Sequence, residues 1–272
     1  MVFPETDEAR VVAAMVQLRD QKLCVPLALG QATEAHVDAL VTLRGLKPAI
    51  ARRMLKKPIH LAAAMVAVGE ADAMVAGADS PTRRVIEAAH IGLGLAQGVT
   101  IPSSFFLMLF PDGREMVFAD CAVNVAPDAE QLASIARASA RTGTALLGEA
   151  RVALLSFSTG TSGAGDSVQT VRAAAAATGF TGPIQADAAL NLTIAAQKGL
   201  GPRDGGGVGA ANVLVFPSLD AGNIGYKLCQ ELAGARALGP FLQGFARPVC
   251  DLSRGATVED IVAATAVAAA MS

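Results

Sequence analysis

Short apolar runs alternate along the chain with longer segments in which apolar residues recur every three or four positions. The second pattern is that of helices with one buried face. It predicts helices over residues 129–147, 167–177 and 222–232, and a more completely buried one over 261–271. The short runs predict strands over residues 23–29, 73–76, 104–109, 116–119, 152–158, 184–186, 213–216 and 241–245.

Strands that alternate with helices are typical of crossover units, which build a largely parallel sheet. Residues 152–157 are apolar almost without a break, which fits a strand covered on both faces of the sheet. The predicted fold class is therefore α/β. Ligands of such sheets bind outside the carboxyl ends of the strands, so the loops that follow strands are the places to search for a site. The glycine-dense stretch 199–209 is expected to be a surface loop.

Composition excludes several classes of function. No apolar run reaches the roughly 18 to 20 residues of a membrane span. The N-terminus is acidic where a secretory signal is basic and then apolar, which predicts a cytoplasmic protein without a membrane partner. A net charge of −2, no tryptophan and a single tyrosine argue against a nucleic-acid partner. The four cysteines lie far apart in sequence and form no paired metal-ligand spacing, so they argue for neither a zinc site nor a disulfide framework.

The segment 251–260 carries the most chemistry, because it joins a strand to the last helix and holds Ser253, Arg254 and Asp260. An arginine at a helix N-terminus can bind a phosphate through two parallel hydrogen bonds, with backbone donors and the helix dipole adding to the attraction. A structural alternative competes, since Thr257 and Asp260 have the spacing of a capping box. Asp251 fits either a turn residue or a partner that orients Arg254.

A second strand-to-helix junction, residues 77–84, offers Arg83 and Arg84 as a further anion contact. The alternative is an exposed helix start in which Ser80 or Thr82 is the cap and Pro81 occupies the first turn.

Two more junctions follow the same plan. The loop 158–167 is rich in glycine and hydroxyl groups, so Ser158, Thr159 and Gly160 are candidates to hold phosphate oxygens, although the loop lacks the lysine of a P-loop. In the segment 216–227, Asn223 and Lys227 are candidate ligand contacts, and the alternative is that Asp220 or Asn223 caps the helix. Together the junctions predict a large anionic ligand.

The segments 216–227, 239–244 and 251–255, followed by Asp260, resemble the C-terminal signature of the phosphate acetyltransferase family. Upstream segments resemble the family in the same order, so the likeness covers nearly the whole chain; these are residues 73–78, 103–108, 118–123 and 185–189.

This resemblance implies two α/β/α domains with mostly parallel sheets and a cleft between them, as in isocitrate and isopropylmalate dehydrogenases. Residues 1–98 with 240–272 are expected to form the first domain and residues 99–239 the second. The family resemblance also implies a homodimer.

The implied reaction moves an acetyl group between coenzyme A and inorganic phosphate, with acetyl-CoA, phosphate and acetyl phosphate as the small-molecule partners. Ser253 and Arg254 are expected to engage the acyl phosphate, and Asp260 is expected to deprotonate the coenzyme A thiol. Coenzyme A is a substrate here, and neither a metal nor a redox cofactor is expected.

The chain departs from the family in places. Glu87 and Glu231 stand where some members have arginine, and the region between residues 29 and 45 is shortened. Arg44, Arg83 or Arg84 are candidates to replace the missing arginines on grounds of charge. Two alternatives to acetyl transfer stay open: a butyryl or propionyl transferase, and a non-catalytic sensor that binds acetyl-CoA.

Overall fold

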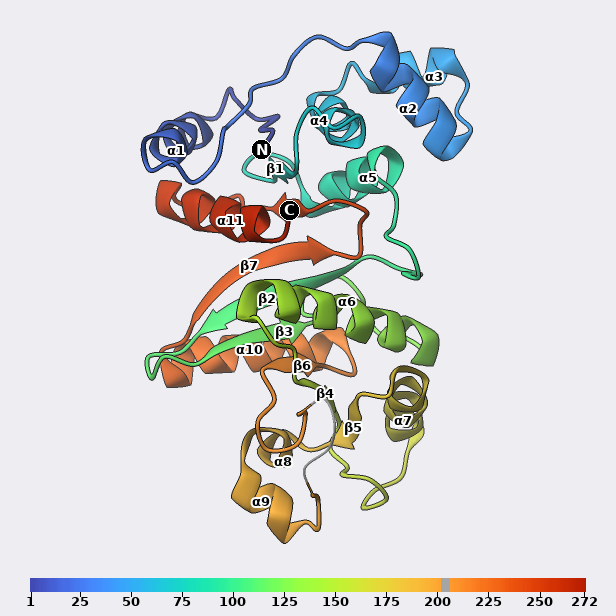
Figure 1. The fold of residues 1–272 in the computed structure, drawn as a ribbon, viewed down its shortest axis with the longest axis vertical. Helices are drawn as coiled ribbons and strands as arrows, with labels where there is room; N and C mark the ends of the chain where they lie inside the picture. The colour runs from blue at the N-terminus through green and yellow to red at the C-terminus, as the bar shows by residue number, and fades with distance from the viewer. Residues whose placement is uncertain (202–205) are drawn as a thin grey trace. The chain divides into compact units, whose positions relative to one another are not determined.

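The computed structural model describes residues 1–201 and 206–272 (Figure 1). The loop expected at residues 199–209 therefore lies partly outside the described residues. The chain divides into two compact units: Met1–Gln97 with Gly239–Ser272 form unit 1, and Gly98–Leu238 form unit 2. The part of the chain that the structure describes contains no helix that is both long and apolar enough to cross a membrane.

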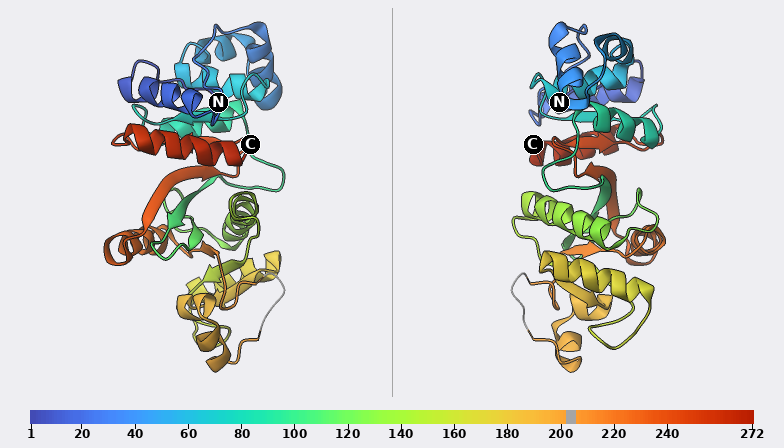
Figure 2. Two further views of the ribbon diagram at one scale, coloured as in Figure 1. Left: turned by 60° about the vertical axis from the view of Figure 1, so that its left-hand side comes forward. Right: turned by 90° about the vertical axis from the view of Figure 1, so that its right-hand side faces the viewer.

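Unit 1 contains a small sheet in which β8 lies between β1 and β7. Strands β1 and β8 are parallel, with Met74 opposite Val249, while β7 and β8 are antiparallel. Helices α4 and α5 contact these strands, and α11 contacts β8 and packs along α1 (Figure 2). The elements of unit 1 are α1 (Ala9–Asp20), α2 (Glu34–Arg44), α3 (Pro48–Met54), α4 (Pro58–Ala67), β1 (Met74–Ala76), α5 (Thr82–Gly92), β8 (Val249–Asp251) and α11 (Val258–Ala270), and β7 (Arg236–Gln243) crosses the unit boundary.

Unit 2 contains a five-stranded sheet in the order β2, β3, β6, β4, β5. Only the pair β2 and β3 is antiparallel, and the other neighbours run parallel. Helices α6 and α7 lie on one side of the sheet and α10 on the other (Figure 2). The elements of unit 2 are β2 (Ser103–Leu109), β3 (Glu115–Ala119), α6 (Ala129–Leu147), β4 (Val152–Leu155), α7 (Asp166–Thr178), β5 (Thr181–Ile184), α8 (Ala186–Leu190), α9 (Leu192–Gln197), β6 (Val213–Val215) and α10 (Leu219–Ala233).

The core of unit 2 explains why its strands lack an alternating pattern. All four residues of β4 are buried, since the sheet is covered on both faces. On the α10 side, Phe106 stacks on Tyr226 with ring centroids 4.1 Å apart, and Phe118 lies beside Phe216. Fully burying a side chain of this size contributes about 1.5–3 kcal/mol, so this layer fixes α10 on the sheet. The α/β class with mostly parallel strands is confirmed.

Most predicted elements are confirmed, with small changes in their ends. The strand predicted over residues 184–186 is misplaced: it shares only Ile184 with β5, because α8 begins at Ala186. Helix α6 has the predicted bounds, because Asp128 and Gln131 form a capping box at its start and Gly148 ends it. The strand predicted over residues 23–29 is wrong. Val25 is 72% exposed, and in this stretch only Leu27 pairs, in an isolated bridge with Val2. Strand β8 was missed, because three residues after a proline give too short an apolar run.

Candidate active site

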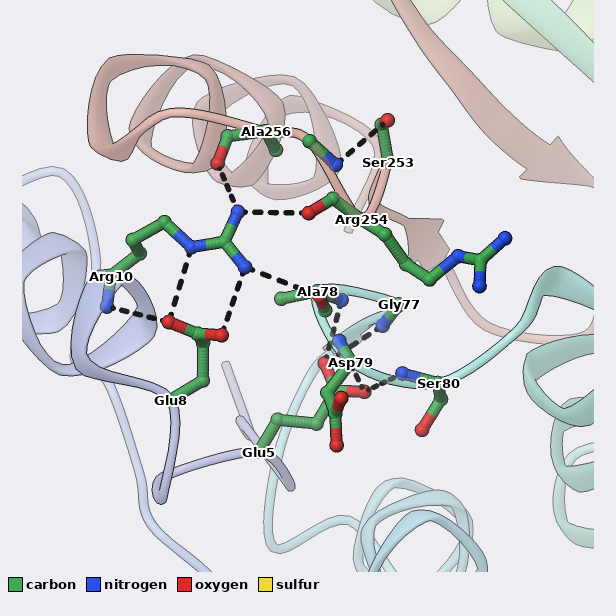
Figure 3. Close-up of polar contacts among 11 residues, drawn as sticks. Glu5, Glu8, Arg10, Gly77, Ala78, Asp79, Ser80, Ser253, Arg254 and Ala256 are labelled. Carbon is green, nitrogen blue, oxygen red and sulfur yellow. Dashed lines mark hydrogen bonds and ion pairs between the residues drawn. The ribbon is translucent and has the colours of Figure 1, made fainter.

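The turn between β8 and α11 places Ser253 and Arg254 on the surface of unit 1. The Oγ of Ser253 accepts a hydrogen bond from the backbone N–H of Gly255 at 3.2 Å. The guanidinium of Arg254 makes no hydrogen bond or ion pair to any residue that the structure describes, and Figure 3 shows its side chain extending from the turn. A free guanidinium next to a serine hydroxyl is an arrangement suited to binding an oxyanion.

Asp260 lies in the first turn of α11 and forms the capping box that the sequence predicts. Its Oδ2 accepts from the backbone N–H of Thr257 at 3.0 Å, and its own N–H donates to Thr257 Oγ1 at 3.2 Å. Asp260 is exposed to solvent, and within the described chain its Oδ1 accepts no hydrogen bond. The capping interpretation is confirmed, and one carboxylate oxygen is left available for a proton.

Asp251, the last residue of β8, is a buried carboxyl group with 2% of its surface exposed. Neither of its oxygens has a hydrogen-bond partner in the described structure, so the hypothesis that Asp251 orients Arg254 is wrong. Burial, with a smaller contribution from the charge of Glu5, raises the pKa of Asp251 to about 6. The hydroxyl of Thr82 opposes this rise in pKa without reaching hydrogen-bond geometry.

The buried carboxyl group predicts a pH-dependent stability. Its folded pKa of about 6 lies above its ordinary value of 3.8, so the stabilising proton is retained at low pH and its contribution is lost as the pH rises from about 4 to about 6. The free energy of unfolding of Asp251→Asn, minus that of the parent chain, should therefore increase by about 2 kcal/mol between pH 4.5 and pH 8. Urea unfolding followed by circular dichroism measures this difference. The exposed Asp72→Asn is the control, and a difference independent of pH for Asp251→Asn would contradict the prediction.

The loop before α5 binds an anion, but that anion is the carboxylate of Glu5 (Figure 3). Glu5 Oε2 accepts from the N–H groups of Gly77 and Ala78 at 2.9 and 2.8 Å, and Oε1 accepts from Asp79 and Ser80 at 3.3 and 2.7 Å. The predicted caps of α5 are wrong: Pro81 is the N-cap residue, and no side chain caps the helix. Glu5 therefore occupies the backbone donors that this junction would offer to a ligand.

Arg83 and Arg84 lie exposed in the first turn of α5. Arg84 lines a pocket of about 630 Å³ within unit 1, together with Lys57 and the buried His60, whose pKa is lowered by burial. The acidic residues that line this pocket are Glu5, Asp7, Glu8, Asp79 and Glu87. Five carboxylates against two permanent cations make the pocket unfavourable for a polyanion, so Arg84 alone does not make it a phosphate site.

Arg44, at the end of α2, has a structural contact. Its guanidinium donates to the carbonyl oxygen of His90 and, through Nε, to that of Ile91 at 3.3 Å. These carbonyl groups belong to the last turn of α5, where an arginine satisfies unpaired acceptors and opposes the negative end of the helix dipole.

In unit 2, the loop at Ser158, Thr159 and Gly160 is held by its own hydrogen bonds. The buried Ser158 Oγ accepts from Gly163 N–H at 2.8 Å, and Thr159 Oγ1 donates to Gln185 Oε1 at 3.2 Å. The N–H of Gly160 donates to the carbonyl oxygen of Pro183 at 3.0 Å. With these groups already paired, the loop in this conformation is not a phosphate cradle.

Asn223 and Lys227 lie on α10, one turn apart. Ser218 caps this helix by accepting from Ala221 N–H at 3.3 Å, so neither of the predicted caps is correct. The amide of Asn223 donates to the carbonyl oxygen of Cys121 at 3.1 Å, whereas Lys227 is exposed, with its ammonium 5.2 Å from the ring centre of Tyr226. The lysine is the freer of the two groups.

Comparison with known proteins decides the family. The family model described as phosphate acetyl/butaryl transferase matches residues 32–269, which is most of the chain. The chain belongs to this family. A phosphate acetyltransferase of Corynebacterium glutamicum is 38% identical, with 99% of this chain and 92% of the relative covered. One from Nitrosomonas europaea is 41% identical over 99% of this chain, which spans only 36% of that longer protein. A crystal structure of a phosphotransacetylase from Streptococcus pyogenes superposes with a TM-score of 0.91 at 34% identity, covering 99% of this chain and 92% of that one.

One buried polar group of this phosphate acetyl/butaryl transferase family member was not a candidate from its sequence. Asp120 follows β3 in unit 2, and its carboxylate accepts from the N–H and hydroxyl of Ser104 and from the N–H groups of Ala122 and Asn124. No local spacing predicts this cluster, since Ser104 is sixteen residues away on a neighbouring strand. Asp120 orders the β3 to α6 connection against which Asn223 packs.

Proposed function

We propose that the chain catalyses the reversible transfer of an acetyl group between coenzyme A and inorganic phosphate, in which acetyl-CoA and phosphate give acetyl phosphate and CoA. Membership of the phosphate acetyl/butaryl transferase family, with relatives named phosphate acetyltransferase at about 40% identity, is the observation that carries this proposal. The exposed turn with Ser253, Arg254 and Asp260 supplies the chemical groups that the reaction needs.

In the direction of acetyl-CoA synthesis, the carboxylate of Asp260 takes the proton of the CoA thiol. A thiol with a pKa of about 8.5 is only a few per cent ionised at neutral pH, so a positioned base increases the reactive fraction. The thiolate attacks the carbonyl carbon of acetyl phosphate, a carbon–sulfur bond forms, and phosphate leaves as the carbon–oxygen bond breaks. Arg254 and the hydroxyl of Ser253 stabilise the charge on the departing phosphate. The mechanism proposed here uses no metal or redox cofactor.

The decisive experiment is thiol release from acetyl-CoA, followed with a thiol-reactive dye, with and without phosphate or arsenate. Release that depends on either anion supports the proposal. A well-folded chain that binds acetyl-CoA and releases no thiol would overturn it and favour the sensor, which the carboxylates at Glu87 and Glu231 also favour.

Acyl-chain preference is the second question, since the family model covers both acetyl and butyryl transferases. One methylene in an apolar pocket changes binding by about 1–3 kcal/mol, so the rates for acetyl-CoA, propionyl-CoA and butyryl-CoA should differ clearly. A rate that rises with chain length would identify a butyryl or propionyl transferase.

We also propose that the enzyme is a cytoplasmic homodimer. An apolar stripe on α10 supports the dimer, because Ile224, Leu228 and Leu232 are 57%, 51% and 82% exposed and their four-residue spacing places them on one helix face. Such a face is costly to leave in water, and a second copy of the chain would cover it.

The stripe makes the dimer testable. Leu228→Glu and Leu232→Glu place charge in the proposed contact, so sedimentation velocity should show a monomer for these variants and a dimer for the parent. Val25→Glu, at a residue 72% exposed in unit 1, is the matched control and should remain dimeric. A parent chain that sediments as a monomer at micromolar concentration would exclude the proposal.

A further inference from the structure

The main chain of the turn at Arg254 is held from a distance by one side chain, that of Arg10 in the first turn of α1 (Figure 3). Arg10 Nη1 donates to the carbonyl oxygen of Arg254 at 3.0 Å and to that of Ala256 at 2.7 Å. These contacts join residues 244 and 246 positions apart in the sequence.

The remaining donors of Arg10 are also paired. Nε and Nη2 donate to the two carboxylate oxygens of Glu8 at 3.1 and 2.9 Å, and Nη2 reaches the carbonyl oxygen of Ala78 at 3.4 Å. A guanidinium has five N–H donors in a fixed plane, and here each is directed at an acceptor. Glu8 fixes the orientation of the group, so the two carbonyl oxygens of the turn meet a preformed donor pair.

A neighbouring side chain, Glu5, holds the adjacent loop through its four contacts to backbone N–H groups between Gly77 and Ser80. This loop touches the segment leading to the turn. Leu252 N–H donates to the carbonyl oxygen of Ala76 at 2.7 Å, and a Cβ on Gly77 would lie 2.6 Å from Leu252 N. Gly77 also has a φ of +108°, which only glycine adopts without strain. The N-terminal segment therefore holds two neighbouring loops. The carboxylate of Glu5 accepts hydrogen bonds from the loop at residues 77–80, and the guanidinium of Arg10 donates to the turn at residues 254–256.

Arg10 contacts the main chain of Arg254 and not its side chain. Its carbonyl oxygen is bound by Arg10, while its guanidinium extends away from Arg10 and is unpaired in the part of the chain described (Figure 3). The local hydrogen bonds of the turn are few: Gly255 N–H to Ser253 Oγ at 3.2 Å, and Ala256 N–H to the carbonyl oxygen of Ser253 at 2.9 Å. An exposed turn with so few bonds of its own depends on the clamp for a single conformation.

We infer that Arg10 is a positioning residue for the reaction, which fixes the backbone of Arg254 and Ala256 so that the Arg254 guanidinium is presented to the phosphate group. This inference rests on the proposed function. A displacement of about 1 Å at a reacting group can cost on the order of 100-fold in rate, so a clamp that acts on the main chain alone is sufficient for a kinetic role.

The test uses Arg10→Ala and Arg10→Lys in the full-length chain, with Arg19→Ala as the control, since Arg19 is an exposed arginine on the same helix. The first readout is amide hydrogen exchange of the peptides covering residues 252–257 and 77–80, without substrate. Both Arg10 variants should exchange at least tenfold faster at residues 252–257, because the single ammonium of lysine cannot bind both carbonyl oxygens and Glu8 in this geometry. Exchange in Arg19→Ala should match the parent.

The second readout is kinetic and separates positioning from general damage. Arg10→Ala should lower kcat/KM for phosphate by about 10- to 100-fold and change the KM for acetyl-CoA less than twofold. In an Arg254→Ala background the same substitution should cost less than twofold, because the guanidinium that Arg10 positions is gone. Arg10→Lys provides the same comparison should Arg10→Ala not fold.

Two results would contradict the positioning role of Arg10. An equal loss of activity in both backgrounds, or unchanged exchange at residues 252–257, overturns it. If the parent chain consumes no acetyl-CoA in the presence of phosphate, the proposed function fails instead, and the exchange measurement alone decides whether Arg10 holds the turn.

Discussion

Replacing Arg254 with alanine should lower the phosphate-dependent rate of thiol release by about 10²- to 10³-fold, the usual cost of losing one preorganised donor to an oxyanion. The reason is that Arg254 has no structural partner for its side chain among the described residues, so its charge is free for the substrate. The effect should appear mainly as a lower kcat/KM for phosphate. Steady-state kinetics with phosphate and acetyl-CoA varied separately would measure it.

Two further variants test whether the loss of rate is specific to the guanidinium of Arg254. Arg247→Ala removes an exposed arginine from the same unit and should leave the rate within twofold of the parent. Arg254→Lys keeps the charge but loses the planar fork, so it should recover only part of the rate. The melting temperature of Arg254→Ala should match the parent, because no hydrogen bond of the side chain is lost. A fully active Arg254→Ala protein would remove this residue from the mechanism.

The fold was largely predictable from the sequence because its elements have strong local signals. Helix α6 combines a regular apolar stripe with a capping box at Asp128 and a terminal Gly148, and its predicted ends are correct. Element predictions were wrong where the local apolar pattern does not match the burial of the segment in the folded chain. The apolar run at residues 23–29 indicated a strand, yet Val25 is exposed and the segment has no continuous partner strand.

The candidate site was predictable only in part, for a different reason. The capping box of Thr257 and Asp260 lies within four residues, so its spacing is visible in the sequence. The anion at residues 77–80 is Glu5, and the clamp on the turn is Arg10, and neither contact leaves a local trace. Hydrophobic periodicity carries no information about which side chain from the N-terminal segment reaches which backbone group.

Asp260 is both a helix cap and the proposed base, and these roles can be separated because they use different properties of the side chain. Capping needs an oxygen that accepts from Thr257 N–H, which an amide also provides, whereas proton removal needs a carboxylate. Asp260→Asn should therefore lower kcat by about 10²- to 10⁴-fold while changing the free energy of unfolding by less than about 0.5 kcal/mol. Thiol release and urea unfolding of the same preparations measure the two effects.

Thr257→Ala is the converse variant, since it removes the hydroxyl that accepts from Asp260 N–H and leaves the carboxylate in place. It should cost about 1 kcal/mol of stability and keep most of the activity. Asp260→Ala should show both losses together. An Asp260→Asn protein with the activity of the parent would limit Asp260 to the cap and require another group to ionise the thiol. An inactive but fully stable Asp260→Asn protein would instead show that the charge of Asp260 serves the reaction, while its oxygen acceptor at the start of α11 serves the fold.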